Sequence, residues 1–259
     1  MTLAEIYKNV HTQLSKDGNT GFIPMDRFNS LLPFILYELI RKEAATNNMN
    51  LEHGNEELLS LQVLSDLIVF KEDFATSASI ALNSSNFTYT PLYFISANTS
   101  KNTGHNTTGV VRKIKFVSQK EYNASLTNMM KMNLDENPVC FIHNKVSGST
   151  FYDYLNIYPT SINYIDMIFV KKPSDPFLDY YMDSSHKLYF LTSGQQITIS
   201  GGSQYRDGTI TGTKTSITQE LQIPTDYHVK FQDLLLERIS LAIDVQYANQ
   251  FAMSKEQKI

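Results

Sequence analysis

The sequence contains a single cysteine, Cys140, among its 259 residues. An intrachain disulfide is therefore excluded, and such sparse cysteine usage is typical of a protein made in a reducing cytoplasm. Cys140 lies in the apolar run 139–142. A thiol in such a run is expected to be buried and chemically inert.

Long hydrophobic runs are also missing. No apolar run approaches the roughly 20 residues that a membrane-spanning helix needs. The first ten residues have the spacing of an amphipathic helix and lack the apolar core of a signal peptide. We therefore expect a protein that is synthesised in the cytoplasm and has no membrane segment.

An excess of positive charge is lacking as well. The chain has 22 Lys and Arg against 26 Asp and Glu, which gives a formal net charge of -4. Proteins that hold nucleic acid are usually basic, so stable binding of DNA or RNA is disfavoured, although DNA can still pass by without binding. With 42% hydrophobic and 19% charged residues, the chain is globular and long enough to bury a core.

Local motifs for catalysis or metal binding are absent. No histidine is paired with another ligand residue at a metal-binding spacing, and no nucleophile elbow, phosphate loop or dinucleotide fingerprint occurs. Asp175, Asp179 and Asp183 recur every four residues, but the glycine and closing glutamate of a calcium loop are missing, so a solvated turn is predicted. We expect no enzyme activity, no cofactor and no metal site.

The first quarter of the chain has helical periodicity. Apolar residues repeat at helical spacing over 3–14, 28–40 and 56–67. Pro33 falls inside the second repeat, which predicts either a kink or a helix that begins only at Pro33. These patterns predict an N-terminal helical region over 1–75.

The next segment, 76–225, is predicted to be an antiparallel β region. Strand-like runs occupy 110–117, 138–143, 153–159 and 162–170, and the short turns between the last of them favour a meander of about four strands. Within this region, 192–218 is rich in glycine and combines short strand patterns with turn dipeptides. It is predicted to be a β-hairpin insertion that leaves the sheet.

The last segment, 226–259, is predicted to be a long helix with two apolar stripes. A helix on the surface of a monomer needs only one stripe. One interpretation is that the first stripe packs back on the helical region, completing one composite α+β domain, while the second contacts a partner. The alternative is a helix buried within one core. The first stripe contains Leu234, Leu235, Leu241, Ala242 and Val245, and the candidate contact residues of the second are Leu236, Ile243, Tyr247 and Phe251.

Six short segments follow one another in an order that resembles a known family. They are 21–29 (GFIPMDRFN), 66–70 (DLIVF), 111–121, 155–159 (LNIYP), 171–176 (KKPSDP) and 220–228 (ELQIPTDYH). Their order and spacing resemble the head–tail connector, or neck ring, proteins of crAss-like phages of gut Bacteroidales. Two segments depart from the family pattern, namely 91–94 and the glycine-rich 192–218. These departures leave open which ring of the neck the chain would form.

The resemblance implies a virion structural protein. By likeness to dodecameric adaptors of short-tailed phages, the chain would assemble as a ring of twelve copies below the portal protein. It would contact the portal and adjacent ring or tail proteins, and line part of the genome-exit channel. An acidic chain suits such a conduit, because a basic lumen would retain DNA.

Two other classes of function stay open at this point. One is another virion or tail structural protein, such as a tail tube or adhesion subunit, which its assembly partners would distinguish from a connector ring. A small-molecule-binding protein or an enzyme without local motifs is the third class. A deep pocket with converging polar groups would favour the third class.

Overall fold

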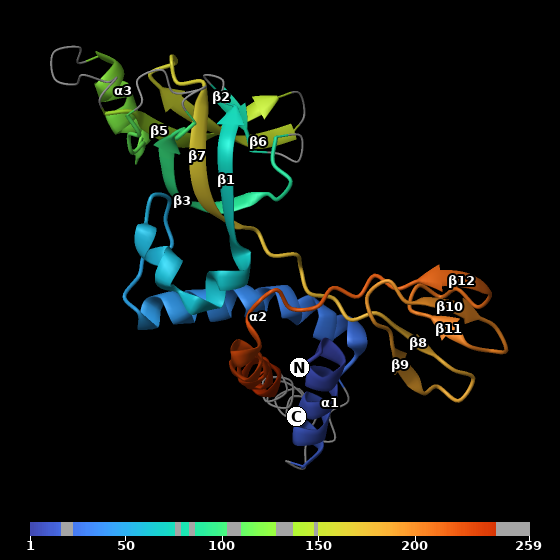
Figure 1. Cartoon of the computed structure of the whole chain (residues 1–259). Helices are drawn as coiled ribbons and strands as arrows, with labels where there is room; N and C mark the ends of the chain where they lie inside the picture. The colour runs from blue at the N-terminus through green and yellow to red at the C-terminus, as the bar shows by residue number, and fades with distance from the viewer. Residues whose placement is uncertain are drawn as a thin grey trace, which may run out of the picture. The chain divides into compact units, whose positions relative to one another are not determined.

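The structure, a computed structural model, describes residues 1–16, 23–75, 79–82, 86–102, 110–127, 137–147 and 150–241. The chain is α+β, with helices, small and mainly antiparallel sheets, a glycine-rich hairpin and a C-terminal helix, as the sequence predicted. Figure 1 shows these elements. In the described part of the chain, no helix combines the length and apolarity that crossing a membrane requires.

The chain gathers into two compact units. The terminal unit comprises Met1–Lys42 and Ser174–Ile259, and the central unit comprises Glu43–Pro173. The sequence analysis instead expected one composite domain divided after residues 75 and 225. The boundaries differ because residues 68–75 pair with a strand of the central unit, whereas the chain after 173 bonds to the second helix.

Two helices begin the terminal unit, α1 (Leu3–Lys16) and α2 (Met25–Thr46), the second of which runs past the unit boundary. Helix α1 buries Leu3, Ile6 and Val10 at the predicted helical spacing. Helix α2 begins at Met25, so a start delayed to Pro33 is wrong. Pro33 removes one helix hydrogen bond without ending the helix.

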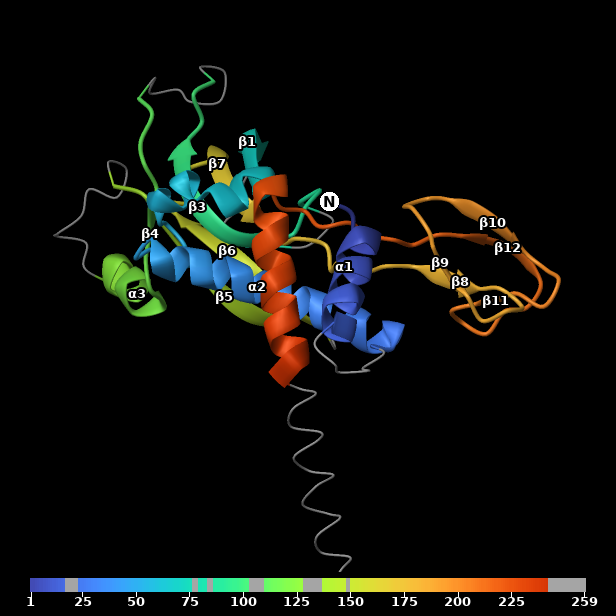
Figure 2. The ribbon, with the colours of Figure 1, turned by 90° about the horizontal axis from the view of Figure 1, so that it is seen from below.

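The described part of the C-terminal helix, residues 228–241, packs on α1 and α2 (Figure 2). It follows the short 3-10 helix η3 (Thr225–Tyr227). Phe231, Leu235 and Ile239 are four residues apart and almost completely buried, which places them on one face of the helix. Polar contacts flank this face: Asn9 donates to Gln232 at 3.1 Å.

Residues 177–219 of the terminal unit form a β-arm, which begins and ends at one base. A pair of backbone hydrogen bonds between Phe177 and Gln219, of 2.9 and 2.8 Å, closes its base. Its two antiparallel sheets have the orders β11-β8-β9 and β10-β12. The β10–β12 pair confirms the predicted hairpin, and a small core of Leu191, Ile199 and Tyr205 lies inside the arm. The strands are β8 (Tyr180–Met182), β9 (Leu188–Phe190), β10 (Gln196–Ile199), β11 (Gln204–Tyr205) and β12 (Gly212–Thr215).

The central unit begins with two 3-10 helices, η1 (Glu56–Ser60) and η2 (Gln62–Leu67), where the sequence predicted one α-helix. Asn55 caps η1 by accepting a hydrogen bond from the Glu57 amide at 3.0 Å. The next residues form strand β1 (Ile68–Ala75), so the predicted helical region ends earlier than residue 75. The apolar periodicity over 56–67 therefore predicted correctly that one face is buried. It did not distinguish a 3-10 helix from an α-helix.

Two sheets follow in the central unit, with the orders β1-β7-β3 and β2-β6-β5-β4. Strand β7 lies at the centre of the first sheet, so the predicted four-strand meander is wrong in this detail. Strands β4 and β5 are parallel, and the other pairs are antiparallel. A shared core includes Phe94 and Phe169 of the first sheet and Ile157 of the second. The remaining strands are β2 (Ser79–Ala81), β3 (Pro91–Thr99), β4 (Lys115–Phe116), β5 (Val139–Ser147), β6 (Thr150–Tyr158) and β7 (Tyr164–Lys171).

Helix α3 (Gln119–Thr127) was not predicted, although its start has a sequence signal. Ser118 and Glu121 form a capping box: the Ser118 amide donates to the Glu121 carboxylate at 2.9 Å, and the Glu121 amide donates to the Ser118 hydroxyl at 3.3 Å. The predicted strand 110–117 is reduced to β4 and an isolated bridge at Lys113. The alternating apolar pattern of 110–117 ends where the capping box at Ser118 starts α3.

Candidate interaction site at the root of the β-arm

The four predicted contact residues are placed only in part. Leu236 is half-buried on the C-terminal helix, and Ile243, Tyr247 and Phe251 lie outside the described residues. The structure adds Val229, seven residues before Leu236, whose side chain is 60% exposed. Because seven residues make about two helical turns, Val229 and Leu236 lie on the same side of the helix.

Leu241 is 50% exposed, although the sequence analysis placed it on the inward stripe with Leu235. The buried face is centred on Phe231, Leu235 and Ile239. Six residues of helix turn a side chain by about 240° from Leu235, so Leu241 points away from this face. The buried stripe therefore runs along Phe231, Leu235 and Ile239 and does not include Leu241.

An ion pair also joins this helix to α2. Arg238 donates to both carboxylate oxygens of Glu38, from Nε at 3.0 Å and from Nη2 at 2.6 Å. The hydrogen bonds from Arg238 lower the pKa of Glu38 below its ordinary value. A bidentate pair of this kind fixes the orientation of both side chains.

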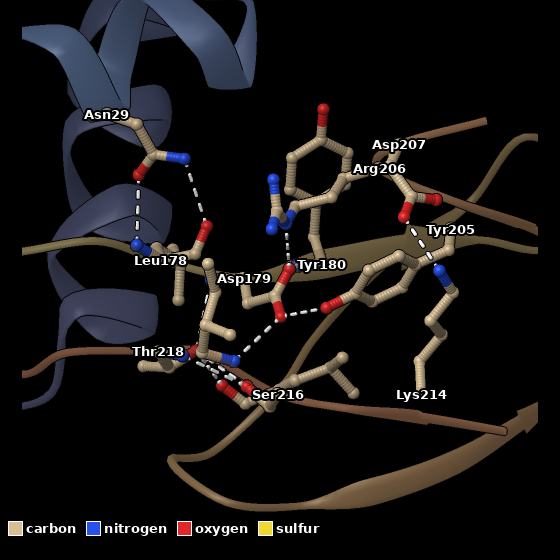
Figure 3. A network of polar contacts seen from close by, with 12 residues as sticks. Asn29, Leu178, Asp179, Tyr180, Tyr205, Arg206, Asp207, Lys214, Ser216 and Thr218 are labelled. Carbon is tan, nitrogen blue, oxygen red and sulfur yellow. Dashed lines mark hydrogen bonds and ion pairs between the residues drawn. The ribbon is translucent and has the colours of Figure 1, made fainter. Parts of the chain in front are cut away.

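The base of the β-arm is attached to α2 by one buried amide. Asn29 donates from Nδ2 to the Leu178 carbonyl at 3.0 Å and accepts from the Leu178 amide at 2.9 Å. Figure 3 shows this reciprocal pair beside the helix. Asn29 thus replaces the strand partner that the backbone of Leu178 would otherwise need.

The next residue, Asp179, is fully buried and accepts four hydrogen bonds. Arg206 Nε lies 2.9 Å from Oδ1, and the Tyr180 amide donates to the same oxygen at 3.0 Å. The Tyr205 hydroxyl and, at 3.0 Å, the Ile217 amide donate to Oδ2. Figure 3 shows these groups converging from separate segments of the arm. The prediction of a solvated turn at Asp179 is therefore wrong, because its carboxylate is the polar centre of the arm.

Thr218 extends the network to Leu191, the residue that directly follows β9. Its hydroxyl accepts from the Asp179 amide at 3.0 Å and donates to the Leu191 carbonyl at 2.6 Å, and its amide donates to the Ser216 hydroxyl at 3.1 Å. Among the described residues, no buried side-chain nitrogen or oxygen lacks a hydrogen-bond partner. A satisfied buried network specifies one arrangement of the segments that it joins.

Burial also affects the ionisation of Tyr205. Desolvation raises the pKa of its hydroxyl above the ordinary value, and the hydrogen bond to Asp179 raises it further. The hydroxyl therefore stays protonated and serves as a donor. Arg206 stacks over the ring of Phe177, with its guanidinium carbon 5.1 Å from the ring centre. These groups hold one another and leave no free acid, base or nucleophile.

A groove of about 260 Å³ lies beside the root of the arm in the terminal unit. Its centre is aromatic: the rings of Tyr7 and Phe190 lie 5.2 Å apart, inclined at 63°. The volume is below the range of about 300–1,000 Å³ that is usual for small-molecule pockets. The groove is lined by Tyr7, Lys8, His11, Thr12, Leu188 and Phe190.

The central unit has a separate hollow of about 360 Å³ near His53. His53 Nδ1 accepts a hydrogen bond from the Phe94 amide at 3.1 Å, and the ring stacks on Phe116 with centres 6.4 Å apart. The residue is exposed as a whole, but its ring lies against these aromatic groups. This burial lowers the pKa of His53 below its ordinary value.

The lowered pKa of His53 predicts a pH dependence of stability. The folded chain favours the neutral ring, so its contribution is present above the unfolded-state pKa, near 6.5, and is lost as the pH falls through the folded pKa. We expect the thermal midpoint to fall with acidification below about pH 6.5. In His53→Asn, whose Oδ1 can still accept from the Phe94 amide, this part of the pH dependence should disappear. A His53→Asn midpoint that follows the wild-type pH profile would assign the effect to other groups.

Metal binding and thiol chemistry receive no support from the described residues. No group of three or more His, Cys, Asp or Glu side chains there is arranged to hold a metal ion. Cys140 is 1% exposed, and burial raises the pKa of its thiol. Its predicted burial is confirmed, and the raised pKa disfavours the reactive thiolate.

No protein-family model matches the chain, and no curated protein matches it.

The residues at the root of the arm carry weak sequence signals. Asp179 attracted attention through its spacing from Asp175 and Asp183, but the residues that bind it are 1, 26, 27 and 38 positions away. Asn29 lies 149 positions from Leu178. Contacts over such distances depend on the fold, so no local pattern reports them.

Proposed function

We propose that the chain is a virion structural protein, one subunit of a ring in the phage head-to-tail connector below the portal. The observation that carries this proposal is the rigid attachment of the β-arm. Asn29 holds the base of the arm to α2, and the Asp179–Arg206 pair holds the segments of the arm to one another. A rigid appendage with a very small core adds little to the stability of its own subunit. Such an appendage is typical of a part that contacts a neighbour.

The exposed side of the C-terminal helix supports the same proposal. Val229 and Leu236 begin a stripe that the sequence continues through Ile243, Tyr247 and Phe251. The arm and this stripe are two different surfaces. A cyclic ring needs such a pair, because each subunit meets its neighbours through two unlike patches.

The remaining parts of the proposal rest on the order of sequence segments that resembles neck ring proteins. The partners would be further copies of the chain in a ring of twelve, together with the portal and adjacent ring or tail proteins. The protein would lie in the neck of the virion after synthesis in the bacterial cytoplasm. The net charge of -4 suits a channel through which DNA passes without binding.

Cryo-electron microscopy of purified phage particles, with symmetry imposed on the neck, tests the proposal. Density for a closed ring of this fold between portal and tail would support it and would count the copies. Density elsewhere in the tail would favour a tube or adhesion subunit. Absence of the protein from all particles would reject the virion role and direct attention to small-molecule binding.

The apolar stripe gives a second, biochemical test. We expect Ile243→Asp combined with Tyr247→Asp to abolish ring assembly, because two charges would be buried in the subunit contact. The thermal midpoint and circular dichroism of the isolated chain should stay unchanged. Assembly is measured by light scattering after size-exclusion chromatography and by negative-stain microscopy.

Leu241→Asp is the matched control, since this exposed leucine lies on another side of the same helix. It should assemble as the wild type does. Loss of folding in the double variant would show that the stripe belongs to the core of the subunit. Normal assembly of the double variant would remove the stripe from the proposed contact.

A further inference from the structure

Two features lie on the surface of the terminal unit. The first is the groove between α1 and β9, and the second is Ile210, which lies in the connection between β11 and β12 and is 61% exposed. Ile210 does not line the groove of its own chain.

The groove has the size and lining for one apolar side chain. Its volume of about 260 Å³ is small for a metabolite, and its wall is formed by Leu188, Phe190 and Tyr7. The Tyr7 hydroxyl is already bonded to the Ile23 carbonyl at 3.1 Å, so the ring presents mainly carbon to the groove. An apolar occupant beside this ring would not cost the Tyr7 hydroxyl its hydrogen-bond partner.

Ile210 is presented on a narrow part of the chain. Gly208 and Gly212 flank it with positive φ values of 85° and 116°, and its direct neighbours are the small residues Thr209 and Thr211. A side chain added at Gly212 would meet no atom within 4 Å, so the space around the turn is open. Such a turn can bring one apolar side chain into a shallow groove.

The other large exposed apolar side chains of this unit fit the groove less well. Val229 and Leu241 lie on a helix, which with its side chains is about 10 Å wide and cannot enter so small a groove. Phe34 also lies on a helix, α2, and the Arg238 guanidinium stands 5.8 Å from its ring centre. Ile217 belongs to the base of the arm, where its amide is bonded to Asp179.

The charges beside the two features are complementary. Lys8 stands at the groove, with its ammonium 5.9 Å from the centre of the Phe190 ring. Asp207, three residues before Ile210, is held by the Lys214 ammonium at 2.7 Å and by the Thr209 amide at 3.0 Å. These contacts lower the pKa of Asp207, so it is ionised at neutral pH. A second copy docked by Ile210 would bring this carboxylate toward Lys8.

We propose that Ile210 of one copy inserts into the groove lined by Tyr7, Leu188 and Phe190 of the next copy. The contact is heterologous, because the inserted turn and the receiving groove are different surfaces of the same unit. Repetition of such a contact closes into a ring when the rotation per subunit allows it. This inference rests on the proposed ring and names the surfaces of one subunit contact.

Cysteine cross-linking tests the contact in the full chain. Thr12→Cys places a thiol at the rim of the groove, and Ile210→Cys places one on the inserted turn. The native Cys140 is buried and should not react, which wild-type protein treated in the same way will check. A short bismaleimide is added to each variant alone, to an equal mixture of the two, and to the double variant.

We expect covalent dimers in the mixture, none in either single variant, and a ladder up to the copy number of the ring in the double variant. Dimers from a single variant alone, or none in the mixture, would overturn the inference. Closed rings seen by microscopy without the mixed dimer would reject the contact and leave the proposed function standing. Mixed dimers together with open chains and no ring in particles would do the reverse.

Discussion

Replacing Asp179 with alanine is expected to lower the free energy of unfolding by roughly 3 kcal/mol, because the change breaks a buried ion pair and leaves its donors without an acceptor. Four donors meet this carboxylate, among them Arg206 Nε and the Tyr205 hydroxyl. The Arg206 side chain is 30% exposed and can regain some water, which limits the loss. Tyr205 is only 3% exposed, so its hydroxyl has no such access to water.

Urea unfolding followed by circular dichroism measures the overall effect, and hydrogen exchange locates it. The amides of Tyr180 and Ile217, which donate to Asp179, should exchange faster in the variant. The matched control is Asp207→Asn, which changes an exposed carboxylate in the same arm and should leave the midpoint near the wild-type value. Equal midpoints for Asp179→Ala and the control would show that the buried network does not hold the arm.

Phe231→Ala is expected to cost about 3–5 kcal/mol of stability, because truncating a large buried side chain removes apolar contacts and leaves a cavity. Phe231 is 0% exposed on the inward face of the C-terminal helix, with Leu235 and Ile239 on the same face. The helix joins α1 and α2 through this face. The variant should therefore weaken the whole terminal unit and not only the end of the chain.

Val229→Ala serves as the control for this change. Val229 lies on the same helix but is 60% exposed, so its truncation should change the free energy of unfolding by no more than about 0.5 kcal/mol. Both variants are compared by urea unfolding at a concentration where the chain is monomeric. A small effect for Phe231→Ala would mean that the helix can detach without unfolding the unit.

Shortening the β-arm is expected to destabilise it. The glycine-rich stretch 201–212 is the simplest segment to delete. In the structure, this stretch contains Tyr205 and Arg206, which bond to the buried Asp179. Deleting it would leave that carboxylate without two of its four donors, so a test of docking should use point changes at Ile210 and keep the arm complete.

Much of the secondary structure was predictable because it depends on local periodicity. The buried residues of α1 recur at helical spacing, and the residues of β10 coincide with a short alternating segment before a glycine turn. The failures have local causes as well. The apolar spacing over 56–67 is compatible with an α-helix and with a 3-10 helix. The capping box at Ser118 directly follows a strand-like run, which obscures the start of α3.

The sequence by itself determined the α+β class, the burial of Cys140, the β-hairpin and the presence of an amphipathic C-terminal helix. These properties follow from the spacing of apolar and turn residues along the chain. Only the tertiary structure decided that Asp179 is buried, that Asn29 holds Leu178, and which face of the C-terminal helix packs inward. Each of these depends on residues far apart in sequence, whose meeting is set by the packing of whole elements and leaves no local pattern.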